Sequence, residues 1–266
     1  MKTYKEVFSE LKRAALIPFF VIGDPDYDTS VAIVKAAVDA GADILELGIP
    51  FSDPIADGPT IQKADIRARN GGMTVQRGLE FIREVKDYKD IPIGLLMYYN
   101  LVYQYGTEKF FSDSYKVGVN SVLVADLSID DADEIIAPAK SAGLDSVFMV
   151  TPNTDEERMK AIASKTTGFI YTVSLYGVTG SREELSDMVE GLVGKLKKVT
   201  SVPVCVGFGI SKPEHAASVA SAGADGVIIG SKIVQLIEEN LGSKEKTLAE
   251  IAKFIGQIKS AIENQR

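Results

Sequence analysis

The sequence is poor in the residues that support thiol and imidazole chemistry. Its 266 residues include one cysteine, Cys205, and one histidine, His215. A disulfide within the chain is therefore impossible, and a zinc cluster built from Cys and His ligands of one chain is excluded. A nucleophile activated by histidine is nearly ruled out as well. We expect Cys205 to be a small buried residue and His215 to lie at the surface, so that acid–base chemistry falls to Asp, Glu, Lys or Tyr.

The sequence also lacks a basic cluster, a long apolar run and a signal peptide. The net charge is −8, which argues against a nucleic-acid-binding surface. No apolar stretch approaches the length of a membrane span, and the first residues lead into an amphipathic segment rather than a secretory signal. Apolar residues make up 45% and charged residues 25%, which is typical of a globular protein with a full core. We expect a cytoplasmic protein that binds neither nucleic acid nor membrane.

A pattern of helix, glycine and short apolar strand recurs along the chain. In each copy a helix ends at a glycine, where a helix C-terminus prefers one, and a strand follows. The glycines of the copies are Gly41, Gly118, Gly143 and Gly223. Such alternation predicts βα units around a parallel sheet. About eight strands can be counted, which is the number that closes a (β/α)8 barrel near 250 residues.

We therefore predict one domain over residues 1–266, a single (β/α)8 TIM barrel with an additional N-terminal helix at 3–14. The alternative is an open doubly wound sheet. That fold would favour a glycine-rich dinucleotide turn after the first strand, and Val21-Ile-Gly-Asp-Pro-Asp is not such a turn. Helix starts are predicted at three Ser or Thr residues that precede Glu by three positions: Thr154, Ser181 and Ser211.

Two carboxylates stand out near the predicted C-terminal ends of strands, where a barrel places its active site. Glu46 lies within the apolar strand Ile44–Gly48, where an ionised side chain is costly. Period-two alternation puts Glu46 on the interior face, so burial should raise its pKa and let it act as acid and base near neutrality. Asp57 follows in a proline-rich loop that can fold back over the barrel mouth, although Asp-Gly is also an ordinary turn.

Two glycine-rich turns follow the predicted seventh and eighth strands. They are Val206-Gly-Phe-Gly-Ile-Ser and Ile229-Gly-Ser-Lys, and the second opens a short helix at about 233–239. Small residues let backbone N–H groups approach an anion, and a helix N-terminus adds a favourable dipole. These two units are the usual phosphate-binding place of a barrel. Glycines can also serve only to make tight turns, but their occurrence in both units favours a phosphate site.

The residues alone thus predict a barrel that binds a phosphorylated small molecule, with two carboxylates and Tyr171 above the barrel. The loop at 176–182 contains two glycines and a threonine, which suits either a lid over the ligand or a simple connector. Because there is no metal cluster or redox motif in the sequence, lyase or isomerase chemistry by proton transfer is the expected class.

The stretch Leu45-Glu-Leu-Gly-Ile-Pro-Phe-Ser-Asp-Pro-Ile-Ala-Asp-Gly-Pro-Thr-Ile-Gln resembles the signature of the α subunit of tryptophan synthase. The resemblance continues through Met97-Tyr-Tyr-Asn, through Tyr171 to Gly180, and through Gly207-Phe-Gly-Ile-Ser. It implies a (β/α)8 barrel and a carbon–carbon lyase of tryptophan biosynthesis. This lyase cleaves indole-3-glycerol phosphate to indole and glyceraldehyde 3-phosphate in a retro-aldol step, with no cofactor or metal in this chain.

The resemblance also implies roles for individual residues. Glu46 matches the catalytic glutamate, which protonates the indole ring at C3 and helps to take the proton from the glycerol hydroxyl. Asp57 matches the catalytic aspartate, which accepts the indole N–H and stabilises the positive charge on the ring. Tyr171 matches the tyrosine beside the glutamate. The indole pocket is implied at Phe19, Tyr98 and Thr179, where Thr179 is the lid threonine that meets the aspartate. The phosphate site is implied at Gly180, Phe208, Gly209, Gly230 and Ser231.

A partner follows from the same resemblance. The family works with a pyridoxal-phosphate β subunit, as an αββα-type heterotetramer, and that subunit receives indole through a tunnel. Asp53, Pro54 and Asn100 match positions near this contact. The pyridoxal phosphate belongs to the partner. The chain departs from the family where Leu127-Ser-Ile-Asp-Asp replaces the common Leu-Pro, and at Leu175, where some members have Arg.

Two alternatives concern the function. An indole-glycerol-phosphate synthase shares the phosphate turns but uses a catalytic lysine on a strand, and we find no such lysine. The chain could instead be a catalytically weak subunit that binds a phosphorylated indole and mainly activates a β subunit. The presence of both Glu46 and Asp57 argues against that second alternative.

Overall fold

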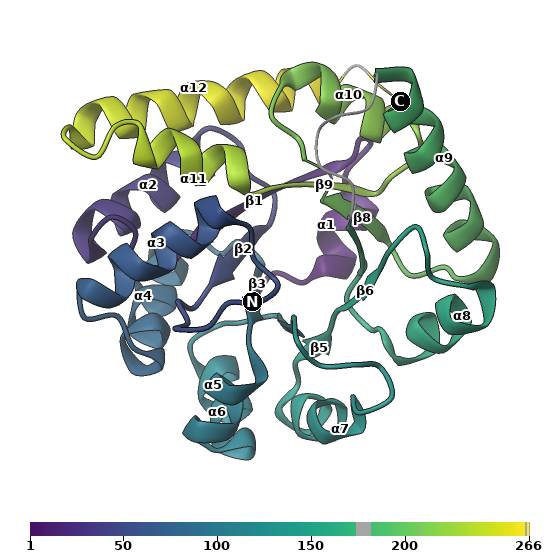
Figure 1. The fold of residues 1–266 in the computed structure, drawn as a ribbon, viewed down its shortest axis with the longest axis horizontal. Helices are drawn as coiled ribbons and strands as arrows, with labels where there is room; N and C mark the ends of the chain where they lie inside the picture. Colours follow the sequence, from purple (N-terminus) through teal and green to yellow (C-terminus); the bar gives the residue numbers. More distant parts are fainter. Residues whose placement is uncertain (174–181, 208, 264, 266) are drawn as a thin grey trace.

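A ring of parallel strands forms the centre of the molecule and helices surround it (Figure 1). The computed structural model describes residues 1–173, 182–207, 209–263 and 265, with the backbone alone at 182–187. The strands are β1 (Ala15–Val21), β2 (Leu45–Gly48), β3 (Ile93–Met97), β4 (Ser121–Val124), β5 (Asp145–Ser146), β6 (Phe148–Val150), β7 (Ile170–Val173), β8 (Val204–Gly207) and β9 (Gly226–Ile229).

The described chain has nine strands because one of the eight expected strands is interrupted. Val147 alone separates β5 from β6, and the sheet order is β5-β4-β3-β2-β1-β9-β8-β7-β6. The N–H of Val147 donates to the carbonyl of Val122 on β4 at 3.2 Å, so the two ends of the sheet meet through one continuous piece of chain. The predicted (β/α)8 barrel is confirmed, and the open doubly wound alternative is wrong.

Twelve helices in the described residues cover the outside and one end of the ring. They are α1 (Tyr4–Glu10), α2 (Tyr27–Asp39), α3 (Pro59–Asn70), α4 (Val75–Tyr88), α5 (Tyr99–Tyr105), α6 (Thr107–Lys116), α7 (Asp133–Ala142), α8 (Glu156–Lys165), α9 (Arg182–Val199), α10 (Pro213–Ser221), α11 (Ser231–Glu238) and α12 (Lys244–Glu263). The last helix packs against α2 and α10, which joins the C-terminal part of the chain to the N-terminal part.

Two of the predicted helix starts are wrong. The side chain of Asp155, rather than Thr154, caps α8 by accepting the N–H of Arg158 at 2.8 Å. The cap position of α10 is Lys212, whose side chain accepts no hydrogen bond from the helix. The amide of Ser211 instead donates to Nδ1 of the half-buried His215 at 3.4 Å. The third predicted start, Ser181, lies outside the described residues.

The strands separate two apolar cores. Leu45 and Leu47 face outward and pack with residues of the surrounding helices, whereas Ile44 faces the barrel interior. At the N-terminal end of the strands, α1 closes the interior with Tyr4, whose hydroxyl lies 2.7 Å from the hydroxyl of Ser121. Cys205 is buried in the interior, as expected. The alternation that puts Ile44 inside also puts Glu46 inside, two residues nearer the opposite end of the barrel.

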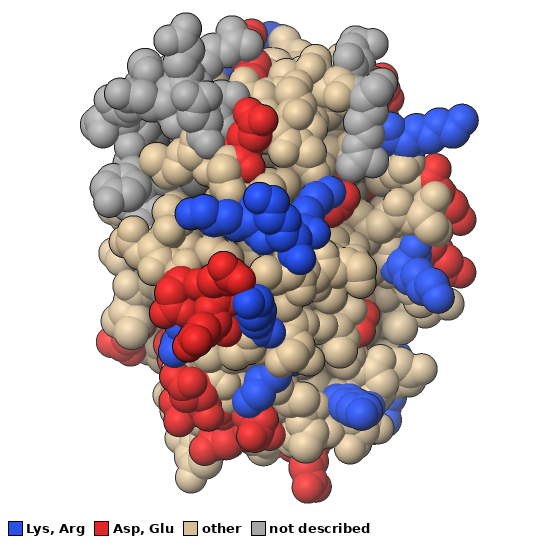
Figure 2. Space-filling view, turned by 90° about the vertical axis from the view of Figure 1, so that its right-hand side faces the viewer, with Lys and Arg blue, Asp and Glu red and all other residues tan. Residues whose placement is uncertain are grey.

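The outer surface carries charges of both signs. On the face drawn in Figure 2, acidic and basic side chains lie next to one another. Ion pairs occur at the surface of the described residues: Arg158 lies 3.0 Å from Asp130, and Lys165 lies 2.9 Å from Asp133. Exposed pairs of this kind contribute little to stability.

Candidate active site

A cavity of about 490 Å³ lies at the C-terminal ends of the strands. Its lining brings together these residues that the sequence predicts: Phe19, Glu46, Asp57, Tyr171, Gly209, Gly230 and Ser231. Three further predicted residues, Thr179, Gly180 and Phe208, lie outside the described residues. The predicted partner-contact residues Asp53, Pro54 and Asn100 do not line the cavity, and Asp53 and Asn100 are exposed.

Glu46 is held inside the barrel by β2, in register with Phe19 on β1 and Gly94 on β3. Its side chain is 3% exposed, and Oε2 has no hydrogen-bond partner in the described part of the chain. Burial, and secondarily the negative charge of Asp57, raises the pKa of Glu46 to about 8. At neutral pH the carboxyl group is therefore mostly protonated, and it can donate a proton to a ligand in the cavity.

Asp57 lies at the end of the loop that leads from β2 to α3. The hydroxyl of Tyr98 donates to Oδ2 of Asp57 at 2.6 Å and accepts the N–H of Ala56 at 3.1 Å. Burial raises the pKa of Asp57, and the hydrogen bond from Tyr98 opposes that shift because it favours the ionised form. Tyr98 was expected in an indole pocket; it is 3% exposed, lies outside the cavity lining and holds Asp57 in place.

Small residues on neighbouring strands make room for the two aromatic side chains of the cavity. A Cβ atom added at Gly207 on β8 would lie 2.5 Å from the hydroxyl of Tyr171 on β7. A Cβ atom added at Gly48 on β2 would lie 2.9 Å from the ring of Phe19, and one at Gly230 would lie 3.2 Å from it. Burial raises the pKa of Tyr171 well above its usual value, so its phenol is neutral. This spacer role of Gly48 and Gly207 was not predicted from the sequence.

Another part of the cavity lining is formed by the start of α11. Gly230 occupies the cap position of this helix, Ser231 is its first residue, and Gly209 follows β8 with a φ of 44°. Lys232 also lines the cavity, and its Nζ donates to Oε1 of Gln235 at 3.3 Å. Among the lining residues that the structure describes, Lys232 carries the one positive charge. No role for this lysine was predicted from the sequence, although it lies within the glycine-rich turn.

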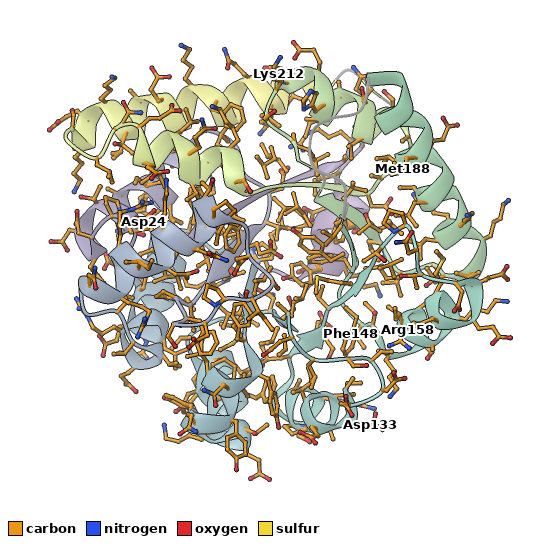
Figure 3. The ribbon with its side chains drawn as sticks, in the orientation of Figure 1. Asp24, Asp133, Phe148, Arg158, Met188 and Lys212 are labelled. Carbon is orange, nitrogen blue, oxygen red and sulfur yellow. The ribbon has the colours of Figure 1, made fainter. Side chains whose placement is uncertain are left out.

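The helix that follows Asp57 is anchored by an ion pair outside the cavity. Arg67 on α3 donates two hydrogen bonds, of 2.7 and 3.0 Å, to the carboxylate of Asp24, which follows β1. Figure 3 labels Asp24 in the part of the molecule that holds α2 and α3. Asp24 is 1% exposed, and burial raises its pKa by more than Arg67 lowers it. The guanidinium also lies 3.7 Å from Glu238 of α11. This network joins α3 to the helix whose N-terminus faces the cavity.

Within the described ranges, no group of three or more His, Cys, Asp or Glu side chains is placed to hold a metal ion. No helix in that part of the chain has the length and apolar character needed to cross a membrane. The described lining of the cavity includes the protonated carboxyl group of Glu46, the carboxyl group of Asp57, the neutral phenol of Tyr171 and the N-terminus of α11.

The comparisons with known proteins agree with this geometry. A family model described as "Tryptophan synthase alpha chain" matches residues 6–263. The chain belongs to the tryptophan synthase alpha chain family. The alpha chain of Methanothermobacter thermautotrophicus is 45% identical over 259 residues, which cover 97% of this chain and 96% of that protein. The alpha chain of Methanoregula boonei is 42% identical over 263 residues, 99% of each chain.

Solved structures show the same barrel. The tryptophan synthase alpha subunit of Legionella pneumophila superposes with a TM-score of 0.91 at 32% identity, covering 99% of both chains. A chain of the tryptophan synthase a2b2 complex from Pyrococcus furiosus gives a TM-score of 0.87 at 39% identity, covering 94% of this chain and 99% of that one. Alpha chains of this family cleave indole-3-glycerol phosphate in tryptophan biosynthesis, so the expected family and lyase reaction are confirmed. The roles of individual residues stay predictions.

Proposed function

We propose that this chain cleaves indole-3-glycerol phosphate to indole and glyceraldehyde 3-phosphate, with Glu46 transferring the protons and Asp57 binding the indole ring. The observation that carries the proposal is the lining of a single cavity by both carboxyl groups and by the N-terminus of α11. A substrate that has an indole ring at one end and a phosphate at the other matches these two features of the lining. The bond to be broken would then lie between them, near Glu46.

The protons balance over the proposed reaction. The protonated carboxyl group of Glu46 donates its proton to C3 of the indole ring, and the positive charge moves to the ring nitrogen. The resulting carboxylate takes the proton of the glycerol hydroxyl, and the bond between C3 and the glycerol carbon breaks as the aldehyde forms. The electron pair of the broken bond restores the aromatic indole ring, and Glu46 is protonated again at the end of the cycle. The raised pKa of about 8 fits this cycle, because the resting group has to be an acid.

Asp57 has the complementary role. Its carboxylate accepts the indole N–H and stabilises the positive charge that develops on the ring nitrogen. The hydroxyl of Tyr98, at 2.6 Å, favours the ionised form that this role requires. The two carboxyl groups thus differ in protonation because their surroundings differ: Glu46 has an orphaned buried oxygen, and Asp57 has a hydrogen-bond donor. Phe19 packs beside the ring, and Tyr171 presents a neutral phenol next to Glu46.

The phosphate is proposed to bind at Gly209, Gly230 and Ser231, together with Gly180 and Phe208. A helix N-terminus favours an anion. A cation in the first helical turn, where Lys232 lies, is unfavourable without an anion nearby. Lys232→Met should therefore raise KM for the substrate several-fold and leave kcat within about twofold, whereas Lys232→Arg should keep KM close to the wild-type value. An unchanged KM in Lys232→Met would remove this lysine from the phosphate site.

The proposal includes a partner and a location. Asp53 and Asn100 are exposed. The hydroxyl of Tyr98 accepts the N–H of Ala56, which brings the loop that carries Asp53 close to the segment that carries Asn100. Both residues can therefore take part in one contact with a β subunit. The a2b2 complex of the Pyrococcus furiosus protein supports such an assembly. This chain needs no cofactor for its reaction, and pyridoxal phosphate would belong to the β subunit. We place the protein in the cytoplasm, as one barrel domain over residues 1–266.

The direct test is indole release from indole-3-glycerol phosphate by the purified chain, measured alone and with a tryptophan synthase β subunit. Release in either condition supports the lyase. A chain that binds the substrate and activates the β subunit, but releases no indole in either condition, would instead be a binding subunit. A chain that neither binds nor cleaves the substrate would contradict the proposal altogether.

A further inference from the structure

Another buried carboxyl group, that of Asp65, lies near the loop that carries Asp57. Asp65, on α3, is 5% exposed. Its Oδ1 accepts the N–H of Phe51 at 3.4 Å, and its Oδ2 has no hydrogen-bond partner in the described residues. A buried carboxyl group with an unsatisfied oxygen is costly to keep. The reaction described above makes no use of this group, so its burial needs another reason.

A continuous series of contacts leads from Asp65 to Asp57. Phe51, whose N–H reaches Asp65, is at the start of the loop that follows β2. Its ring stacks on the ring of Tyr98, with centroids 5.0 Å apart and an angle of 25° between the planes. The hydroxyl of Tyr98 donates to Asp57 at 2.6 Å. Each member of the series therefore fixes the position of the next.

We propose that Asp65 is a positioning residue, which holds the start of the Asp57 loop through Phe51 and so keeps Tyr98 and Asp57 aligned for the indole ring. The inference rests on the proposed function, because it takes the role of Asp57 from it. Asp65 does not line the cavity, so it acts on the reaction only through the other residues of the series.

The charged groups that face Asp65 are mostly acidic. Asp57 faces it from the loop, Asp24 from the end of β1 and Arg69 from α3 itself. Burial, and then the charge of Asp57, raises the pKa of Asp65 to about 7. The neutral carboxyl group still has a carbonyl oxygen that accepts the N–H of Phe51. Asparagine reproduces that neutral group closely, whereas leucine has a similar size and no acceptor.

These two substitutions form the test, with the kcat and KM of indole release as the readout. Asp65→Leu should lower kcat about tenfold, because small displacements of a catalytic group cost this much or more. KM should change less than about twofold, because the phosphate side is untouched. Asp65→Asn should keep kcat within about twofold at pH 6, where Asp65 of the wild type is mostly protonated. Equal losses in both variants, or a rise in KM at constant kcat, would overturn the proposal.

A double-mutant cycle tests the route through Tyr98. In a Tyr98→Phe background, where the hydroxyl is already absent, Asp65→Leu should lower kcat by less than about twofold. A full tenfold loss in that background would show that Asp65 acts by another route. If Asp65→Leu does not fold, Phe51→Leu removes the ring stacking and should give the same loss in kcat alone. A wild-type chain without indole release refutes the proposed function, whereas an active wild type with unaffected variants refutes only this inference.

Discussion

Glu46→Gln should remove the activity and, at neutral pH, change the stability of the chain in a pH-dependent way. The wild-type chain has to keep a carboxyl group protonated in the barrel interior at a pH where the unfolded chain would ionise it. Glutamine has nearly the same shape and no proton to bind. The variant should therefore gain stability relative to the wild type as the pH rises, which separates the energetic role of this carboxyl group from its catalytic role.

The magnitude follows from the raised pKa. The ordinary pKa of the group is 4.5, and in the folded chain it is about 8. The stability that the neutral group contributes is fully present below pH 4.5 and is lost as the pH rises toward 8. Each pH unit in this window corresponds to about 1.4 kcal/mol, so the loss at pH 7 is about 3 kcal/mol. Burying the glutamine amide adds a cost that does not depend on pH. The test is therefore the pH dependence of the difference in the free energy of unfolding, rather than its value at one pH.

Urea-induced unfolding of both chains at pH 5, 6, 7 and 8, followed by circular dichroism, measures this slope. Asp65, whose pKa is also raised, is present in both chains, and its contribution cancels in the difference. The difference in the free energy of unfolding should move in favour of the variant by about 3 kcal/mol between pH 5 and pH 7.5. Parallel pH dependences of the two chains would refute the reasoning, since they would mean that Glu46 titrates as an ordinary exposed carboxylate.

Three further predictions concern the rate and the stability. The kcat/KM of the wild type should fall about tenfold per unit as the pH rises above about 8, where the acid Glu46 is lost; a constant kcat/KM from pH 7 to 10 would contradict this assignment. Gly207→Ala should lower kcat about tenfold, because the added methyl group would lie 2.5 Å from the hydroxyl of Tyr171 and displace it; an unchanged kcat would show that this position is not needed. Arg67→Ala should lower the free energy of unfolding by about 3 kcal/mol in urea titrations, because it leaves the buried Asp24 unpaired; a loss below about 1 kcal/mol would show that Asp24 needs no partner.

The parts of the fold that follow from local patterns could be predicted from the sequence. Alternation along a strand is a property of the backbone, so the inward direction of Glu46, and with it the raised pKa, followed from its apolar neighbours. A helix that ends at a glycine is also a local pattern, and its recurrence along the chain predicted the βα repeat. The interruption of one strand at Val147 did not follow, because it depends on which neighbouring strand each residue reaches.

The parts that depend on contacts between distant residues could not be predicted. Tyr98 and Asp57 are 41 residues apart, and nothing local indicates that their side chains meet. The burial of Asp65 depends on how the loop that follows β2 returns along α3. Lys232 was visible in its turn, and its place beside a helix N-terminus was a usable signal for an anion site. The cap at Asp155 was missed because two adjacent residues could both serve, and only the backbone decides between them.

The most direct test of the role of Glu46 is single-turnover indole release from indole-3-glycerol phosphate by Glu46→Gln, with the chain in excess over the substrate and its concentration varied, beside the wild type under the same conditions. The central claim is that Glu46 transfers the protons of carbon–carbon bond cleavage while the phosphate side binds independently. It predicts that the variant binds the substrate about as tightly as the wild type and releases indole at least about a hundredfold more slowly. Indole release by the folded variant at close to the wild-type rate would contradict the claim.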